Sequence, residues 1–311
     1  MDKSFIDIIN GSSYVLVVTH TNPDADTISS ALALSNYMYE NRIKHKVYNS
    51  TPNPPRVLDF LPRFDKITTQ IPKYYDLVIY VDCADQHRAK IELKDDVTII
   101  NIDHHQTNTN FGKINIVDDT KGSSCEVLYE SFIKYKVDIS NNIATCLYTG
   151  IYDDTIGFTT PRVDQKTFEN VTNLIKAGAQ PSYIANRLLQ RDSLAKYRII
   201  PKILDTLKLY QEGKIATIYL DNSWLIQTGA TIQECDDVVN MVLSIGVVKI
   251  VAYFRVIDDV VRVSLRSKDN IDVSKIAEKF NGGGHKYAAG LSIEGVDIEA
   301  SINKVIKNIK W

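Results

Sequence analysis

Histidine and aspartate residues follow three apolar stretches of the sequence, where buried strands would end. The stretch 97–103 leads into His104 and His105, 76–81 leads into Asp82, and 14–18 leads into a turn with His20. In open α/β sheets, ligands bind at the carboxyl ends of the strands. An Asp-His-His triplet alone is a weak signal, because adjacent residues of a strand point to opposite faces. Three such strand ends together predict a metal site.

The candidate ligand set contains four carboxylates and two imidazoles. These are His20, Asp24, Asp26, Asp82, His104 and Asp154. Four carboxylates in one pocket would repel and raise one another's pKa values. Two divalent cations would balance their charge, and this donor set suits Mn²⁺ best, Mg²⁺ less well, and Co²⁺, Fe²⁺ or Zn²⁺ in vitro. Two metals about 3.5–4 Å apart would serve in-line displacement at phosphorus.

The simpler alternative is that some of these acids only stabilise helix ends. A helical pattern of apolar residues starts near Asp26, so we expect Asp26 or Thr27 to be the N-cap, a position that favours aspartate. A histidine, Asp24 and Asp26 together exceed what one cap needs. Asp153 and Asp154 close a helical stretch, where the helix dipole disfavours negative charge. That cost is easier to understand if Asp154 binds a cation.

The spacing of apolar residues predicts an α/β fold in two domains. Strands separated by helical segments indicate a mostly parallel sheet with flanking helices. The expected elements before the domain change are helix 3–10, strands 14–19, 46–48, 77–82 and 97–103, helices 122–134 and 141–152, and successive helices over 165–210 with breaks at 178–181 and near Pro201. After residue 213 we expect strands 214–220, 247–257 and 260–265, a hairpin turn at Asp258-Asp259, and helices 231–244, 272–280 and 297–309. The predicted domains are 1–185, a helical connector over 186–212, and a smaller α/β domain over 213–311.

Composition excludes several classes of protein. The 311 residues are 44% hydrophobic and 24% charged, as in ordinary globular proteins. A net charge of −2 argues against holding long duplex nucleic acid through a broad basic surface. No apolar run is long enough to span a bilayer, and the first residues do not resemble a signal peptide. Four widely spaced cysteines indicate buried free thiols and a cytoplasmic location.

The metal-ligand pattern resembles a known family. The set His20-x-x-x-Asp24-x-Asp26, Asp82, Asp103-His104-His105 and Asp154 resembles the four motifs of the DHH phosphoesterase superfamily. Residues 281–290, Asn-Gly-Gly-Gly-His-Lys-Tyr-Ala-Ala-Gly, resemble the glycine-rich motif of the associated DHHA1 domain. The motifs occur in family order over nearly the whole chain.

This resemblance implies a role for each residue. One Mn²⁺ would be held by His20, Asp24 and Asp82, and the other by Asp26, Asp82, His104 and Asp154, with Asp82 bridging. Asp103 would orient His104, and His105 would face the substrate phosphate. Asp82, Asp103, His104 and His105 would therefore form the catalytic group.

The glycine-rich segment could be only a tight turn. Glycines also let backbone N–H groups approach a phosphate, and Arg266 could add a bidentate contact. The resemblance favours substrate binding by Arg266, Gly283, Gly284 and His285.

Length and layout are similar to the nano-RNase/pAp-phosphatase group. RecJ exonucleases carry extra nucleic-acid-binding regions, and family II pyrophosphatases lack the Gly-Gly-Gly-His that follows Ser264–Lys268 here. That group usually reads Asp-Thr-Gly-Arg-Phe at the fourth motif, whereas residues 154–158 read Asp-Thr-Ile-Gly-Phe. An arginine that could contact substrate is therefore missing.

Three functions follow as hypotheses. The first is a Mn²⁺-dependent phosphohydrolase that degrades very short oligoribonucleotides and removes the 3′-phosphate of 3′-phosphoadenosine 5′-phosphate. The second is a phosphodiesterase for cyclic dinucleotides or their linear dinucleotide products. The third is a non-catalytic nucleotide-binding regulator, which would not need six intact metal ligands. We expect no membrane partner, and the chain could form a homodimer.

Overall fold

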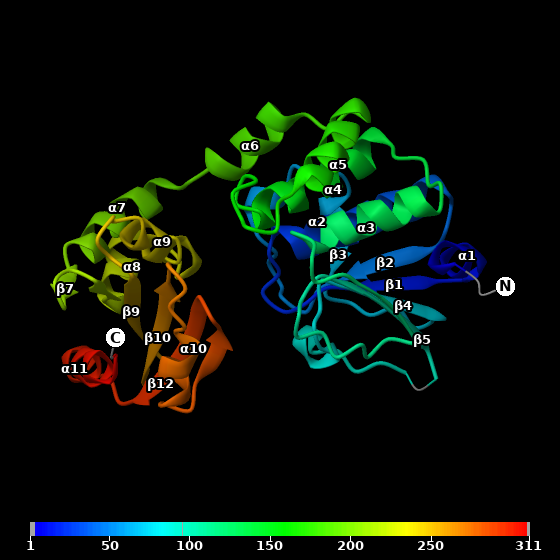
Figure 1. The fold of residues 1–311 in the computed structure, drawn as a ribbon. Coiled ribbons are helices and arrows are strands. Elements are labelled where there is room, and N and C mark those ends of the chain that lie inside the picture. The colour runs from blue at the N-terminus through cyan, green and yellow to red at the C-terminus, as the bar shows by residue number, and fades with distance from the viewer. Residues whose placement is uncertain (1–3, 95, 310–311) are drawn as a thin grey trace. The chain divides into compact units, whose positions relative to one another are not determined.

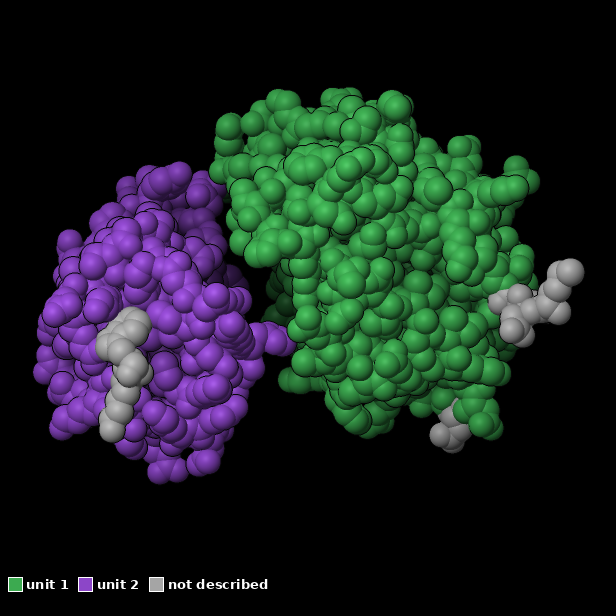
Figure 2. Space-filling view, in the orientation of Figure 1, with its two compact units in different colours: residues 1–191 green, residues 192–311 purple. Residues whose placement is uncertain are grey.

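The computed structural model describes residues 4–94 and 96–309, which form two compact units, residues 1–191 and 192–311 (Figures 1 and 2). The boundary lies inside the predicted connector, 186–212. Helix α6 (Pro181–Leu189) packs on the core of the first unit through Ile184. Helix α7 (Leu194–Leu204) packs on the core of the second unit through Ile199 and Ile203. Because these two helices bury their apolar faces on different cores, each belongs to the unit that it contacts.

The described part of the first unit contains a six-stranded sheet in which every neighbouring pair is parallel, in the order β3-β2-β1-β4-β5-β6. Its strands are β1 (Val15–Val18), β2 (His45–Tyr48), β3 (Ile67–Thr68), β4 (Leu77–Val81), β5 (Thr98–Asp103) and β6 (Ile114–Val117). The predicted parallel sheet is confirmed. The strand order reverses between β1 and β4, and in such sheets the crevice outside that point is where ligands bind.

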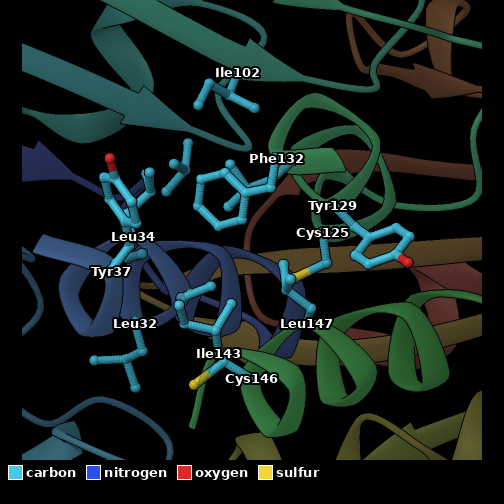
Figure 3. Packing of buried hydrophobic residues seen from close by; sticks show 14 of the residues in the cluster. Leu32, Leu34, Tyr37, Ile102, Cys125, Tyr129, Phe132, Ile143, Cys146 and Leu147 are labelled. Atoms are coloured by element: carbon cyan, nitrogen blue, oxygen red, sulfur yellow. The ribbon is translucent and has the colours of Figure 1, made fainter. Parts of the chain in front are cut away.

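Both faces of this sheet are covered, which explains why β1 and β4 are continuous apolar runs. On one face lie α1 (Phe5–Gly11), α2 (Ala25–Glu40), α3 (Ser124–Lys134), α4 (Asn141–Asp154) and α5 (Gln165–Lys176). Figure 3 shows Phe132 of α3 packed near Ile102 of β5, in the same buried cluster as Leu34 of α2. The other face buries Leu16, Val18, Val78 and Tyr80 with Phe111 packed beside them. The strand ends near the metal ligands therefore stand on a rigid base.

The N-cap of α2 is Asp24, and not Asp26 or Thr27 as the sequence suggested. The Asp24 side chain accepts a hydrogen bond from the backbone N–H of Thr27 at 3.0 Å, so the helix begins at Ala25. The apolar pattern marked the buried face correctly, but helix caps sit before that pattern begins. The predicted helix at 3–10 is found as α1, with residue 3 outside the described part.

The second unit contains a mixed sheet in the order β11-β12-β10-β9-β8-β7 within its described residues. Its strands are β7 (Lys208–Tyr210), β8 (Ile215–Leu220), β9 (Ile250–Ile257), β10 (Val260–Ser267), β11 (Gly283–His285) and β12 (Ala288–Glu294). The predicted hairpin is confirmed: Asp258 and Asp259 have φ of 51° and 60°, as the tight turn of a two-residue hairpin requires.

Helices cover this second sheet on both faces. They are α7, α8 (Asn222–Thr228) and α9 (Val238–Leu243) on one face, and α10 (Ser274–Glu278) and α11 (Ile298–Asn308) on the other. Over 231–244, where one helix was expected, the chain forms a short 3-10 helix at Gln233–Cys235 followed by α9.

Two further expectations for the second unit were wrong, and one strand was not predicted. A helix was expected to continue to residue 210, but residues 208–210 form strand β7, which pairs with β8. Pro201 lies inside α7, since burial of Ile199 and Ile203 holds that helix together on both sides of the proline. Residues 283–285 of the glycine-rich segment form strand β11, which pairs with β12.

Within residues 4–94 and 96–309, none of the helices has the length and apolar character that crossing a bilayer requires. All four cysteines are buried and free, as predicted.

Candidate metal centre

All six predicted ligands take part in overlapping clusters at the carboxyl ends of β1, β4 and β5. Ligand atoms within 4.8 Å of one another form three groups: His20, Asp24 and Asp82; Asp26, His104 and Asp154; and Asp82, His104 and His105. Asp82 and His104 each belong to two groups. The structure therefore brings together side chains that are up to 134 positions apart in the sequence, from His20 to Asp154.

Asp82 is held in place by two hydroxyl groups. Thr27 Oγ1 donates to its Oδ2 at 2.5 Å, and Ser124 Oγ donates to its Oδ1 at 3.0 Å. Its φ is 56°, in the left-handed region that residues other than glycine adopt at a cost. Such strain persists where the surroundings enforce it, often at functional sites. Here the strained backbone places the Asp82 carboxylate within reach of His20 and His104.

His20 has a free ring nitrogen aimed into the cluster. Its Nδ1 lies 2.9 Å from the carbonyl oxygen of Thr21, which fixes the proton on that nitrogen. Its Nε2 is buried, makes no hydrogen bond within the described chain, and lies 3.3 Å from Asp82 Oδ2 and 3.6 Å from Asp24 Oδ2. A buried nitrogen without a partner is uncommon. A metal ion would satisfy it, and an imidazole held by a carbonyl at Nδ1 is the usual arrangement of a histidine ligand.

The start of α3 holds Asp26. The backbone N–H groups of Ser124 and Cys125 donate to its two carboxylate oxygens at 2.6 and 3.0 Å. Gly150 of α4 makes room for this contact, because a Cβ there would lie 2.3 Å from Cys125 Sγ and 2.7 Å from Asp26 Oδ1. Sequence reasoning missed Ser124 and Gly150 as supports of the site. The available signal was a glycine inside a helical pattern, between Thr149 and Ile151.

His104 joins the second half of the cluster. Its Nε2 lies 3.3 Å from Asp154 Oδ2 and 3.7 Å from Asp82 Oδ1, and its Nδ1 lies 3.3 Å from the carbonyl oxygen of Lys121. The backbone just before α3 therefore orients His104.

The resemblance implied that Asp103 orients His104. In the structure Asp103 contacts His105 instead. Its Oδ1 lies 2.7 Å from Nδ1 of His105, and its Oδ2 accepts a hydrogen bond from Asn108. The reason is the two-residue period of an extended chain, which puts residues 103 and 105 on one side and residue 104 on the other. Asp103 therefore fixes the ring of His105.

Burial and mutual repulsion shift the pKa values of the cluster. Burial, and then the charge of Asp82, raise the pKa of Asp26 well above its ordinary value. Burial and then Asp26 raise the pKa of Asp154 to about 8. For His20, burial opposes the charged form, but the carboxylates of Asp24 and Asp82 raise its pKa to about 10. Without cations the acids must take up protons, so the donor set fits divalent metal ions.

Two of the predicted substrate-binding residues of the second unit, Arg266 and His285, share one row of its sheet. Arg266 of β10 pairs with Ala288 of β12, and Ala288 pairs with His285 of β11, so Arg266 and His285 stand on the same face. His285 and both Gly283 and Gly284 are exposed, and Arg266 is half-buried. Gly284 has a φ of 146°, and a Cβ there would lie 2.5 Å from backbone atoms of Ala288 and Ala289. Glycine is therefore required at 284 for the close approach of two strands.

A parallel α/β unit with histidines and aspartates at its strand ends, followed by a smaller mixed-sheet unit, is the arrangement of a two-domain DHH protein. Residues 14–151 match the DHH family, N-terminal domain, and residues 211–310 match the DHHA1 domain. The chain therefore carries a DHH family N-terminal domain and a DHHA1 domain.

Relatives match over nearly the whole chain. The bifunctional oligoribonuclease and PAP phosphatase NrnA of Thermus thermophilus is 27% identical over 298 residues, covering 95% of this chain and 89% of the relative. The cyclic-di-AMP phosphodiesterase PdeA of Listeria monocytogenes is 25% identical and covers 99% of this chain but 49% of the relative. The crystal structure of an exopolyphosphatase-related protein from Bacteroides fragilis has a TM-score of 0.89 at 25% identity, covering 97% of this chain and 93% of that one.

Proposed function

We propose that the chain is a phosphohydrolase that uses two Mn²⁺ ions to degrade very short oligoribonucleotides and to remove the 3′-phosphate from 3′-phosphoadenosine 5′-phosphate. The observation that carries the proposal is the sharing of Asp82 between two His/Asp groups, in a chain similar over 95% of its length to a bifunctional oligoribonuclease and PAP phosphatase. A shared carboxylate is what two neighbouring metal ions need.

The proposed ligand sets follow the clusters. His20, Asp24 and Asp82 would hold one ion, and Asp26, Asp82, His104 and Asp154 the other. When bound, such ions supply Lewis-acid stabilisation of the charge that develops on a phosphoryl group, and they activate water. Thr27 and Ser124 fix the shared carboxylate, and the carbonyl oxygens of Thr21 and Lys121 turn the two imidazoles so that Nε2 faces the centre.

His105 is the proposed contact to the substrate phosphate. Burial opposes its charged form, but the carboxylate of Asp103 raises its pKa, so the ring favours the protonated state. With Nδ1 held by Asp103, the proton on Nε2 is available to a phosphate oxygen. Asp103 keeps the ring in that orientation.

The second unit would hold the substrate through Arg266, Gly283, Gly284 and His285. The row shared by Arg266 and His285 places a guanidinium and an imidazole on one face of the sheet. Small anions such as dinucleotides fit a chain with a net charge of −2 better than long duplexes do. A cytoplasmic location, which fits four free thiols, and a homodimer are further parts of the proposal.

A second candidate is hydrolysis of cyclic dinucleotides or their linear products, which the similarity to a cyclic-di-AMP phosphodiesterase favours. One panel separates the candidates. The purified chain with Mn²⁺ would receive a diribonucleotide, 3′-phosphoadenosine 5′-phosphate and cyclic di-AMP, with products resolved by chromatography. We expect mononucleotides and free phosphate from the first two. Exclusive hydrolysis of the cyclic substrate would favour the second candidate, and no hydrolysis would favour a non-catalytic regulator.

A further inference from the structure

The segment after the fourth motif carries an arginine that sequence reasoning did not assign. The chain has Ile156-Gly157 where related sequences were expected to have Gly-Arg, so no arginine follows Asp154-Thr155 directly. Further on, Arg162 returns to the cluster, and its Nη1 lies 3.5 Å from Nδ1 of His104. The side chain is half-buried at this place.

A strained turn brings Arg162 back to the site. After α4 ends, Ile156, Gly157 and Phe158 have φ of 50°, 64° and 67° in succession. For a β-branched isoleucine that conformation is an outlier, and strain of this kind persists only where the surroundings enforce it. The turn is closed by Thr155, whose Oγ1 donates to the carbonyl of Ile151 at 2.5 Å and accepts from the Phe158 N–H at 3.1 Å.

Aromatic packing anchors the same turn. The ring of Phe158 lies 5.6 Å from that of Tyr152 of α4 and 5.6 Å from that of Phe168 of α5, measured between centroids. Arg162 lies between these anchored points in the chain. The backbone segment that carries Arg162 is therefore anchored on both sides.

The guanidinium has donors that the surrounding protein leaves unused. When Nδ1 of His104 donates its proton to the Lys121 carbonyl, which leaves Nε2 free for a metal ion, that nitrogen cannot also accept from Arg162. Within residues 4–94 and 96–309, no carboxylate forms an ion pair with Arg162. A guanidinium placed beside a metal ligand without an acidic partner is suited to bind a phosphate through paired hydrogen bonds.

We propose that Arg162 binds the non-bridging oxygens of the phosphoryl group under attack and so supplies the arginine that the fourth motif lacks. This proposal rests on the proposed phosphohydrolase function. The strained turn positions the guanidinium. There it would stabilise the negative charge that develops on the phosphoryl oxygens as the phosphate bond breaks.

The test compares the wild type with Arg162→Ala, and with Arg42→Ala as a matched control. Arg42 is exposed and follows the far end of α2, a 16-residue helix about 24 Å long whose first turn carries Asp26. With Mn²⁺ and a diribonucleotide, we expect Arg162→Ala to lose about 10²–10³-fold in kcat/KM and Arg42→Ala to match the wild type. Mn²⁺ affinity, measured by calorimetry, should be unchanged in both. Unchanged kcat/KM in Arg162→Ala, or a loss of Mn²⁺ affinity that accounts for the loss of activity, would overturn the proposal.

A second measurement separates this proposal from the proposed function. Orthophosphate is titrated into the Mn²⁺-loaded wild type and variants. If the wild type hydrolyses none of the substrates, the proposed function fails. Arg162 is then judged by phosphate affinity alone: at least about tenfold weaker binding in Arg162→Ala supports the phosphate contact, and equal or absent binding in the two proteins contradicts it.

A rescue variant adds a positive outcome. Introducing Ile156→Gly and Gly157→Arg into the Arg162→Ala background places a Gly-Arg pair directly after Asp154-Thr155, as expected in related sequences. We expect recovery of activity and of phosphate affinity, which a merely structural role of Arg162 would not produce. A variant that melts like the wild type but recovers neither would contradict the replacement of one arginine by the other.

Discussion

Asp82 is the residue on which both halves of the metal centre depend. Its identity could be predicted, because an apolar strand that ends in an acid is visible in the sequence. Its left-handed backbone and its contacts with Thr27 and Ser124 could not, since they come from residues 55 positions before it and 42 positions after it.

Asp82→Ala and His104→Ala should abolish hydrolysis of every substrate while the chain stays folded. Each removes a side chain that belongs to two ligand groups, so no choice of substrate can compensate. Asp153→Ala is the matched control, because this neighbouring acid is exposed on the same helix. Activity is measured with Mn²⁺ and folding by circular dichroism. An equally complete loss in Asp153→Ala would show that the ligand in this motif is assigned to the wrong residue.

Asp103 shows the limit of assigning a residue's role from a family resemblance. His104 and His105 of the triplet lie in the ligand clusters. Which histidine the acid supports depends on the direction of successive side chains at the end of β5, and Asp103 contacts His105. The two-residue period of a strand, applied to residues 103–105, would have given this result.

Among the elements, the start of α3 was the least predictable part of the site. It supports His104 through the Lys121 carbonyl, Asp26 through two backbone N–H groups, and Asp82 through the Ser124 hydroxyl. Backbone groups have no residue identity, so the sequence could mark the helix but not this contact. The helix start is itself fixed by the fully buried Glu126, which accepts from the N–H of Gly122 at 3.3 Å.

Glu126→Gln should weaken Mn²⁺ binding by about 10- to 100-fold, as loss of an outer support of metal ligands does. The second carboxylate oxygen of Glu126 accepts from Asn170 at 3.2 Å, so an amide would have to turn its NH₂ group toward one of two donors. Glu169→Gln, on the exposed side of α5, is the control. Affinity is measured by calorimetry, and equal Mn²⁺ affinity in all three proteins would rule out this support.

The edge of the second sheet should act on recognition and not on bond cleavage. His285→Ala should lose most activity on a diribonucleotide but keep much of it on bis(p-nitrophenyl) phosphate, which lacks a nucleotide to hold. The comparison of kcat and KM on both substrates checks this. Equal losses on both would place His285 in the chemistry or in the fold.

For the whole molecule, the order of motifs and the parallel sheet could be predicted from strand spacing. Strands β3, β7 and β11 were not predicted, because two or three residues give no readable alternation. Strand β6 was also missed: it is as short as β1, but none of its four residues is fully buried, so it lacks the continuous apolar run of β1. The division between residues 191 and 192 also depends on which core buries Ile184 and Ile199, which local pattern does not reveal.

Stability should depend on metal and pH together. The pKa of Asp154 rises from 3.8 in the unfolded chain to about 8 in the metal-free fold. The folded state therefore binds more protons between these values, and metal-free stability falls as pH rises through that window. His20, raised from 6.5 to about 10, adds stability below pH 6.5 that is lost toward pH 10.

Mn²⁺ at 100 times its Kd should add about 2.7 kcal/mol per site, and this gain should grow with pH because binding displaces protons. Thermal melts at pH 6 and pH 8.5, with chelator and with excess Mn²⁺, measure both effects. Equal melting temperatures with and without Mn²⁺ would contradict the carboxylate cluster as a metal site.

The most direct test of the central claim is a length series of RNA with Mn²⁺. Initial rates of mononucleotide release are measured by chromatography for substrates of two to five nucleotides and for a 24-mer, at equal concentration of ends. We expect much faster release from the short substrates and no release in chelator. Efficient cutting of the 24-mer, or hydrolysis that persists without metal, would contradict it.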